Sequence, residues 1–172
     1  MLVNLNQKLK KIKLLALDFD GTLTQGAYVV FREDGKESVI CSRRDSLGVD
    51  MVKKFGVEVV VISKETNSVV EARCKKMKIK CWHGVKDGQS KLEVLQSYAS
   101  QNNLKPKEVC YGGDDINDLA CIAWAGFGFT VADGHALCKK SAVYVTKARG
   151  GEGAVREICE MILEVQDKPL DY

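Results

Sequence analysis

The sequence predicts an α/β protein whose core is a Rossmann-like, doubly wound parallel sheet. Two observations carry this prediction: short apolar runs recur along the chain, and segments with the period of a helix separate them. The connections between these segments are short, which favours strands joined by crossover helices on both faces of one sheet. Ligands bind such sheets beyond the carboxyl ends of the strands, so the residues that follow each predicted strand are the candidates for a functional site.

The first predicted elements are a buried strand and a β-hairpin. Residues 14–17 are an unbroken apolar run. Residues 27–31 and 37–40 are β-rich, and the Asp34-Gly35 pair between them is a strong hairpin signal.

Helices and strands alternate through the rest of the chain. Gly56 ends the predicted helix at 46–55 as its C′ glycine. Leu92, Leu95 and Ala99 repeat with a helical period in a later segment. Residues 57–62, which follow Gly56, are rich in β-branched residues, as buried parallel strands are. The predicted helices are 46–55, 67–77, 90–102, 115–125 and 153–166, and the later predicted strands are 57–62, 81–84, 109–111, 128–131 and 142–145.

Length and composition predict one globular domain over residues 1–172, with the hairpin as an insertion at about residues 25–41. The formal net charge of +3 is too small to indicate a nucleic-acid partner. We expect no membrane partner, because no apolar stretch approaches the roughly 20 residues that a membrane-spanning helix needs. Seven cysteines without a Cys-x-x-Cys pair predict reduced thiols and a cytoplasmic location.

Two acids end the first predicted strand. Asp18 and Asp20 are one residue apart, so their side chains start on the same side of the chain. Two carboxylates held so close repel each other and lose hydration unless a cation or a shared proton relieves them. This pair therefore indicates a functional site.

Polar residues follow other strands of the predicted sheet. Ser63 comes after the strand at 57–62, and Lys91 opens a later helix. Carboxylates suit Mg²⁺, which prefers oxygen ligands and keeps several waters, whereas the hydroxyl and the ammonium suit a phosphoryl group. The acids that follow the strand at 109–111 are Asp114, Asp115 and Asp118.

Taken singly, these residues have ordinary explanations. Ser63 alone fits a helix cap, Lys91 a surface lysine, and Asp118 an acid stabilised by a helix dipole. Their common position at the strand ends favours one phosphoryl and Mg²⁺ site.

In this order, the motifs resemble the haloacid dehalogenase superfamily of Mg²⁺-dependent phosphohydrolases. The resemblance implies that Asp18 is the nucleophile that forms an aspartyl-phosphate and that Asp20 is the general acid and base. It implies Mg²⁺ bound by Asp18, by Asp114 and by Asp20 through its carbonyl, and phosphoryl binding by Ser63 and Lys91. Asp115 and Asp118 are expected to contact and position these residues without binding Mg²⁺ or the phosphoryl group directly.

Further segments are similar to the branch of 3-deoxy-manno-octulosonate 8-phosphate phosphatases, which also includes phosphatase-like domains of acylneuraminate cytidylyltransferases. This similarity runs from about Lys13 to Gln166 and rests on residues 44–48, 131–133, 144–146 and 150–157. It implies a haloacid dehalogenase fold without a large cap domain. It also implies a homotetramer in which a neighbouring subunit helps to cover the site.

Two glutamates depart from the octulosonate pattern. Glu65 and Glu152 stand where those enzymes typically carry arginines, which favours a nine-carbon substrate such as deaminated or N-acylated neuraminate 9-phosphate over octulosonate 8-phosphate. Arg73 and Arg156 are the candidates for binding the substrate carboxylate.

Two other classes of function are alternatives to a phosphatase acting on a 2-keto-3-deoxy sugar acid phosphate. A receiver-type signalling domain has similar residues, but its acid pair does not lie on the first strand with the Asp18-x-Asp20-Gly21 order. The second alternative is a non-catalytic oligomerisation or regulatory domain associated with a cytidylyltransferase. The presence of every expected acid argues against that domain.

Overall fold

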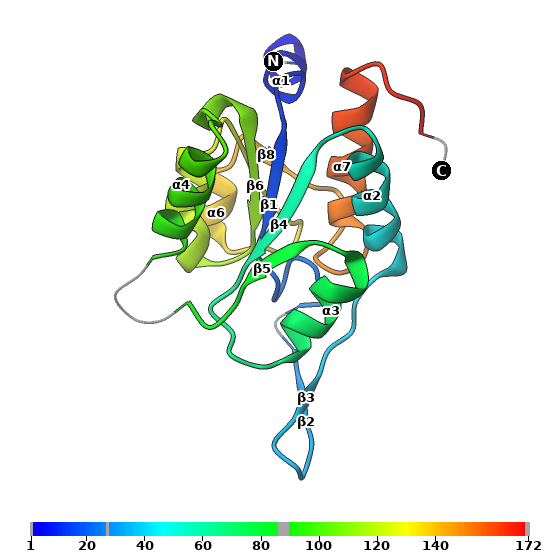
Figure 1. Ribbon diagram of the computed structural model, residues 1–172, viewed down its shortest axis with the longest axis vertical. Coiled ribbons are helices and arrows are strands. Elements are labelled where there is room, and N and C mark those ends of the chain that lie inside the picture. The colour runs from blue at the N-terminus through cyan, green and yellow to red at the C-terminus, as the bar shows by residue number, and fades with distance from the viewer. Residues whose placement is uncertain (1, 27, 86–89, 171–172) are drawn as a thin grey trace.

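The computed structural model describes residues 2–26, 28–85 and 90–170 (Figure 1). In this part of the chain, six strands form one sheet in the order β5-β4-β1-β6-β7-β8, and every neighbouring pair is parallel. The predicted doubly wound parallel sheet is confirmed. Its strands are β1 (Leu14–Leu17), β4 (Glu58–Ile62), β5 (Lys80–Trp82), β6 (Val109–Gly113), β7 (Phe127–Thr130) and β8 (Tyr144–Val145).

Helices cover both faces of the sheet (Figure 1). The alternation of β1 sends Leu15 and Leu17 into a core with α2, α3 and α7, whereas Leu14 and Ala16 face a second core with α4 and α5. The strand is thus buried on both sides, as an apolar parallel strand must be. The helices are α1 (Leu2–Leu9), α2 (Arg43–Lys54), α3 (Val69–Met77), α4 (Lys91–Gln101), α5 (Leu119–Trp124), α6 (Ala136–Ser141) and α7 (Ala154–Val165), with short 3₁₀ turns at η1 (Pro106–Glu108) and η2 (Ile116–Asp118).

Local hydrogen bonds move several element ends away from their predicted positions. Helix α2 begins at Arg43 rather than at residue 46, because the Ser42 hydroxyl accepts from the Arg44 N–H and caps the helix there. The helix predicted at 115–125 is divided into η2 and α5. Helix α6 was not predicted, since six residues are too few to display a helical period.

The insertion between β1 and α2 is a narrow hairpin that extends from the body of the molecule (Figure 1). Strands β2 (Val30–Phe31) and β3 (Glu37–Ser38) pair antiparallel, as predicted from the Asp-Gly turn. Thr24 and Cys41 pair at its base, and Ala27 lies outside the described residues. No cap domain occurs among the described residues between β1 and β4.

All seven cysteines are free. Within the described ranges, no helix combines the length and the apolar character that crossing a membrane requires.

Candidate active site

Three neighbouring strands end in polar residues at one edge of the sheet. Leu17 of β1 pairs with Val61 of β4 and with Gly112 of β6, so these strands end side by side. Asp18, Ser63 and Asp114 follow them directly. The register of the sheet therefore brings together residues that are up to 96 positions apart.

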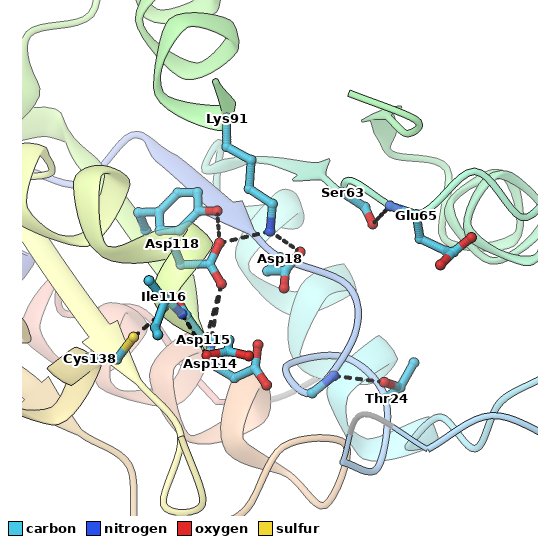
Figure 2. A network of polar contacts seen from close by, with 12 residues as sticks. Asp18, Thr24, Ser63, Glu65, Lys91, Asp114, Asp115, Ile116, Asp118 and Cys138 are labelled. Atoms are coloured by element: carbon cyan, nitrogen blue, oxygen red, sulfur yellow. Dashed lines mark hydrogen bonds and ion pairs between the residues drawn. The ribbon is translucent and has the colours of Figure 1, made fainter. Parts of the chain in front are cut away.

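Lys91 joins two of the acids at this edge. Its ammonium donates to a carboxylate oxygen of Asp18 at 2.6 Å and to one of Asp118 at 2.9 Å. Figure 2 shows the lysine side chain reaching from the start of α4 to both carboxylates. The Lys91 side chain is 1% exposed, and the Asp118 oxygen it contacts also accepts from the Tyr111 hydroxyl at 2.7 Å.

Asp118 is fully occupied by protein donors. Its second carboxylate oxygen accepts from the backbone N–H groups of Asp114 and Asp115. These two bonds tie the loop after β6 to the acid. Asp115 is exposed, and its carboxylate accepts from the N–H of Ile116 (Figure 2).

The site carries more negative charge than the lysine neutralises. Burial and the neighbouring carboxylate of Asp118 raise the pKa of Asp18 well above its usual value, although Lys91 opposes the rise. Burial, followed by Asp118 and Asp115, raises the pKa of Asp114 to about 7. Burial alone would lower the pKa of Lys91, but the Asp18 and Asp118 carboxylates outweigh it and raise that pKa. One ammonium faces three carboxyl groups, so their ionisation would leave an excess of negative charge that a divalent cation would compensate.

The donor set fits such a cation. One carboxylate oxygen each from Asp18, Asp114 and Asp118 lies within 4.8 Å of the others. Since Asp118 is satisfied by Lys91, Tyr111 and backbone N–H groups, Asp18 and Asp114 supply the available oxygens. Gly21, at a φ of +70°, makes room for this arrangement, because a Cβ there would overlap the Asp114 carboxylate.

Asp20 and Ser63 complete the group of residues at the strand ends. Asp20 is half-buried, and burial followed by the nearby charge of Glu65 raises its pKa. The buried Ser63 hydroxyl accepts from the Glu65 N–H at 3.0 Å, which leaves its own proton free for another acceptor.

The two glutamates expected to select the substrate contact the loops around the site. The Glu65 carboxylate accepts from the N–H groups of Thr66 and Asn67. Glu152 accepts from the Gln25 amide at 2.8 Å and lines a pocket of about 330 Å³ between the hairpin base and the loop before α7.

The two candidate arginines are directed elsewhere. Arg73 donates to the backbone carbonyl of Ser42 at 3.0 Å and to the Ser46 hydroxyl, so it holds the start of α2. Arg156 pairs with Glu160 of its own helix at 2.7 Å. Neither guanidinium contacts the network around Lys91, and their role toward a substrate carboxylate stays a prediction.

Comparison with known proteins identifies the family. A model described as haloacid dehalogenase-like hydrolase matches residues 58–158, which is more than half of the chain. The chain belongs to the haloacid dehalogenase-like hydrolase family. The expected class of enzyme, a phosphatase of this superfamily, is confirmed.

Relatives within this hydrolase family span nearly the whole chain. The 3-deoxy-D-manno-octulosonate 8-phosphate phosphatase of Escherichia coli K12 is 34% identical over 94% of this chain and 84% of its own length. The corresponding enzyme of Moraxella catarrhalis, solved with a magnesium ion, a phosphate ion and a KDO molecule, has a TM-score of 0.91 at 32% identity, covering 97% of this chain and 94% of that one. The cobalt-bound deoxy-D-mannose-octulosonate 8-phosphate phosphatase of Haemophilus influenzae has a TM-score of 0.86 at 29% identity, covering 94% of this chain and 92% of that one.

Sequence reasoning gave no role to three residues that support the site. Tyr111 was assigned only to a strand, although a tyrosine in a buried strand signals a partner for its hydroxyl. Asp133 and Asp45 accept from backbone N–H groups of the segment before and at the start of α7. Their partners lie 17 to 111 positions away, and no local pattern indicates them.

Proposed function

We propose that this protein is a Mg²⁺-dependent phosphatase that hydrolyses the phosphate ester of a 2-keto-3-deoxy sugar acid through an aspartyl-phosphate. The observation that carries the proposal is the contact of buried Lys91 with Asp18, beside an Asp114 carboxylate oxygen that lies within 4.8 Å of one from Asp18. A structural ion pair between Lys91 and Asp18 would not need Asp114 beside it. A phosphoryl group together with a divalent cation needs Lys91, Asp18 and Asp114.

The proposed roles follow from charge and position. Asp18 attacks phosphorus with its carboxylate oxygen, and the bond from phosphorus to the sugar oxygen breaks. Asp20, whose raised pKa favours the protonated form, gives its proton to the leaving oxygen and then takes one from the water that hydrolyses the aspartyl-phosphate. Lys91 and Ser63 bind the phosphoryl oxygens. Mg²⁺ held by Asp18, Asp114 and the Asp20 carbonyl would neutralise charge on the transferring group.

The relatives support an eight-carbon sugar acid 8-phosphate as one candidate substrate. Glu65 and Glu152 favour the nine-carbon alternative, because a carboxylate accepts hydrogen bonds from hydroxyl groups and repels an anionic substrate group that arginine would bind. We therefore slightly favour a deaminated or N-acylated neuraminate 9-phosphate over octulosonate 8-phosphate as the substrate.

The test compares kcat/KM on octulosonate 8-phosphate, deaminated neuraminate 9-phosphate and N-acetylneuraminate 9-phosphate, with Mg²⁺ and with EDTA. We expect Mg²⁺-dependent release of phosphate that is fastest for a nine-carbon substrate. A preference for the 8-phosphate would overturn the nine-carbon assignment. Equal and weak rates on all three would contradict the substrate class.

The hairpin supports the proposal that the protein acts as a homotetramer. Tyr28, Val30, Phe31 and Ile40 are all more than 60% exposed on a two-stranded ribbon, which on its own is marginally stable. A contact between subunits would bury them. Light scattering on the purified protein should give four times the chain mass of 19.0 kDa, and a monomer would contradict the assembly.

A further inference from the structure

We propose that Asp133 is a positioning residue for the metal-binding carboxylate of Asp114. It lies in the loop after β7 and is not one of the residues with a role in the proposed chemistry. This inference rests on the proposed function in one respect, the assignment of Asp114 as a Mg²⁺ ligand.

The first contact holds the backbone of Asp114. The N–H of His135 donates to the Asp114 carbonyl oxygen at 2.7 Å. Gly134 lies so close to this carbonyl and to the Thr130 hydroxyl that a Cβ would overlap the hydroxyl oxygen. The loop after β7 therefore holds the backbone of Asp114 in place.

The second contact starts from the same loop and reaches the segment before α7. The Asp133 carboxylate accepts from the Gly150 N–H at 2.9 Å, a charge-assisted hydrogen bond. The other carboxylate oxygen meets Arg149 at 3.2 Å, but the arginine side chain is 62% exposed and such a pair contributes little. The bond to Gly150 is thus the main interaction of Asp133.

Gly150 passes this restraint to the loop that follows Asp20. A Cβ at Gly150 would overlap the carbonyl oxygen of Gly21, so the two backbones are in direct contact. Gly151 adds a hydrogen bond from its N–H to the Thr22 carbonyl at 3.0 Å. Gly21 in turn lies directly against the carboxylate of Asp114.

These contacts form a closed ring: Asp114, His135, Asp133, Gly150, Gly21 and again Asp114. One loop thus holds the backbone of the metal ligand directly and holds its carboxylate through two glycine backbones. Removing the Asp133 carboxylate opens the ring at its hydrogen bond to Gly150 and leaves the metal-binding side chain of Asp114 itself unchanged. The Asp114 carboxylate is then no longer held in place beside Asp18. Substitution of a residue that orients a metal ligand typically lowers metal affinity by 10- to 100-fold.

The test measures the binding of Mg²⁺ alone by titration calorimetry, with no substrate present. We expect Asp133→Ala to weaken Mg²⁺ binding by about tenfold or more. Asp133→Asn keeps an oxygen acceptor for the Gly150 N–H and should stay within about threefold of the unsubstituted protein. The matched control is Asp50→Ala in α2, where the acid pairs with Lys53 of its own helix, and it should bind Mg²⁺ as the unsubstituted protein does.

A folded Asp133→Ala protein with unchanged Mg²⁺ affinity overturns the proposal, as does equal loss in the Ala and Asn variants. If Asp133→Ala does not fold, Asp133→Glu decides, because it keeps the charge but displaces the oxygen by one methylene. A folded Glu variant should bind Mg²⁺ at least about threefold more weakly, and unchanged affinity would overturn the proposal.

A failure of the proposed function looks different: the three sugar acid phosphates would not be hydrolysed, while the order of Mg²⁺ affinities among the variants would hold. In an active enzyme, Asp133→Ala should lower kcat and raise the Mg²⁺ requirement with little change in KM.

Discussion

The ammonium of Lys91 lies 2.6 Å from an Asp18 oxygen, and the contact is almost completely shielded from water. The same ammonium meets Asp118 at 2.9 Å, so one cation is shared by two buried carboxylates. This cluster depends on its single cation, because loss of Lys91 would leave both carboxylates buried without a partner of opposite charge.

Lys91→Met should therefore affect both stability and catalysis. We expect the free energy of unfolding of the metal-free protein to fall by about 3 kcal/mol, because two buried carboxylates lose their cation. We expect kcat to fall by about 10²-fold or more, through loss of a phosphoryl-binding donor. Urea unfolding in EDTA and steady-state kinetics measure the two effects. Lys75→Met, on the exposed side of α3, is the matched control and should change neither.

Asp18→Asn should remove activity without unfolding the protein. The amide cannot attack phosphorus, so we expect release of phosphate to fall by about 10⁴-fold. Because burial already disfavours the charged form of Asp18, its neutral replacement should not lower the melting temperature of the metal-free protein. Normal turnover by this variant would exclude Asp18 as the nucleophile.

The pKa of Asp114 predicts how stability depends on pH. An unfolded aspartate has a pKa of about 3.9, whereas burial raises the pKa of Asp114 in the fold to about 7. The fold therefore prefers the protonated acid, and its contribution to stability is complete below the unfolded pKa and is lost as the pH rises through about 7. The metal-free protein should lose this contribution between about pH 4 and pH 7, as the unfolded and then the folded pKa is passed, and Asp114→Asn should not. Urea midpoints of both proteins across this range give the comparison, and parallel curves would contradict it.

Gly21 offers a test that separates steric overlap from backbone strain. Gly21 and Gly35 have nearly the same φ, +70° and +75°, but a Cβ at Gly21 would overlap the Asp114 carboxylate while Gly35 is in open space. Gly35→Ala should cost about 1 kcal/mol, from the left-handed conformation alone. Gly21→Ala should cost clearly more and should also weaken Mg²⁺ binding. Equal losses in unfolding free energy, with unchanged Mg²⁺ binding, would show that the Asp114 side chain simply moves aside.

Much of the sheet was predictable because its strands are apolar in sequence. The runs before Asp18 and Ser63 indicate buried strands, and the rule that ligands bind beyond the strand ends then leads to Lys91 and Asp114. Element ends were less predictable, since hydrogen bonds such as that of Ser42 to Arg44 decide them. The direction of a long side chain was not predictable, because the Arg156 guanidinium pairs with Glu160, an acid that the motif does not single out.

Asp45 shows why capping across the fold escapes sequence reasoning. This buried acid of α2 accepts from the N–H groups of Gly153 and Arg156 and so caps α7, a helix more than 100 positions away. Asp45→Ala should lower the free energy of unfolding by about 2 kcal/mol, because it leaves buried N–H groups without acceptors. Asp45→Asn, which keeps one acceptor, should recover part of that loss in urea unfolding. An unchanged midpoint in the Ala variant would show that other groups cap α7.

The contact between Gly150 and Gly21 has a consequence for synthesis on the ribosome. Every acid proposed for the metal and the phosphoryl group has been made once residue 118 is joined, but the glycines that hold the loop after Asp20 are joined some thirty residues later. The growing chain thus carries its mutually repelling acids before it possesses the segment that supports them. A product that stops short of Gly150 has the acids of a phosphatase without the frame that holds them in place, and the cell should degrade it as an unfolded chain.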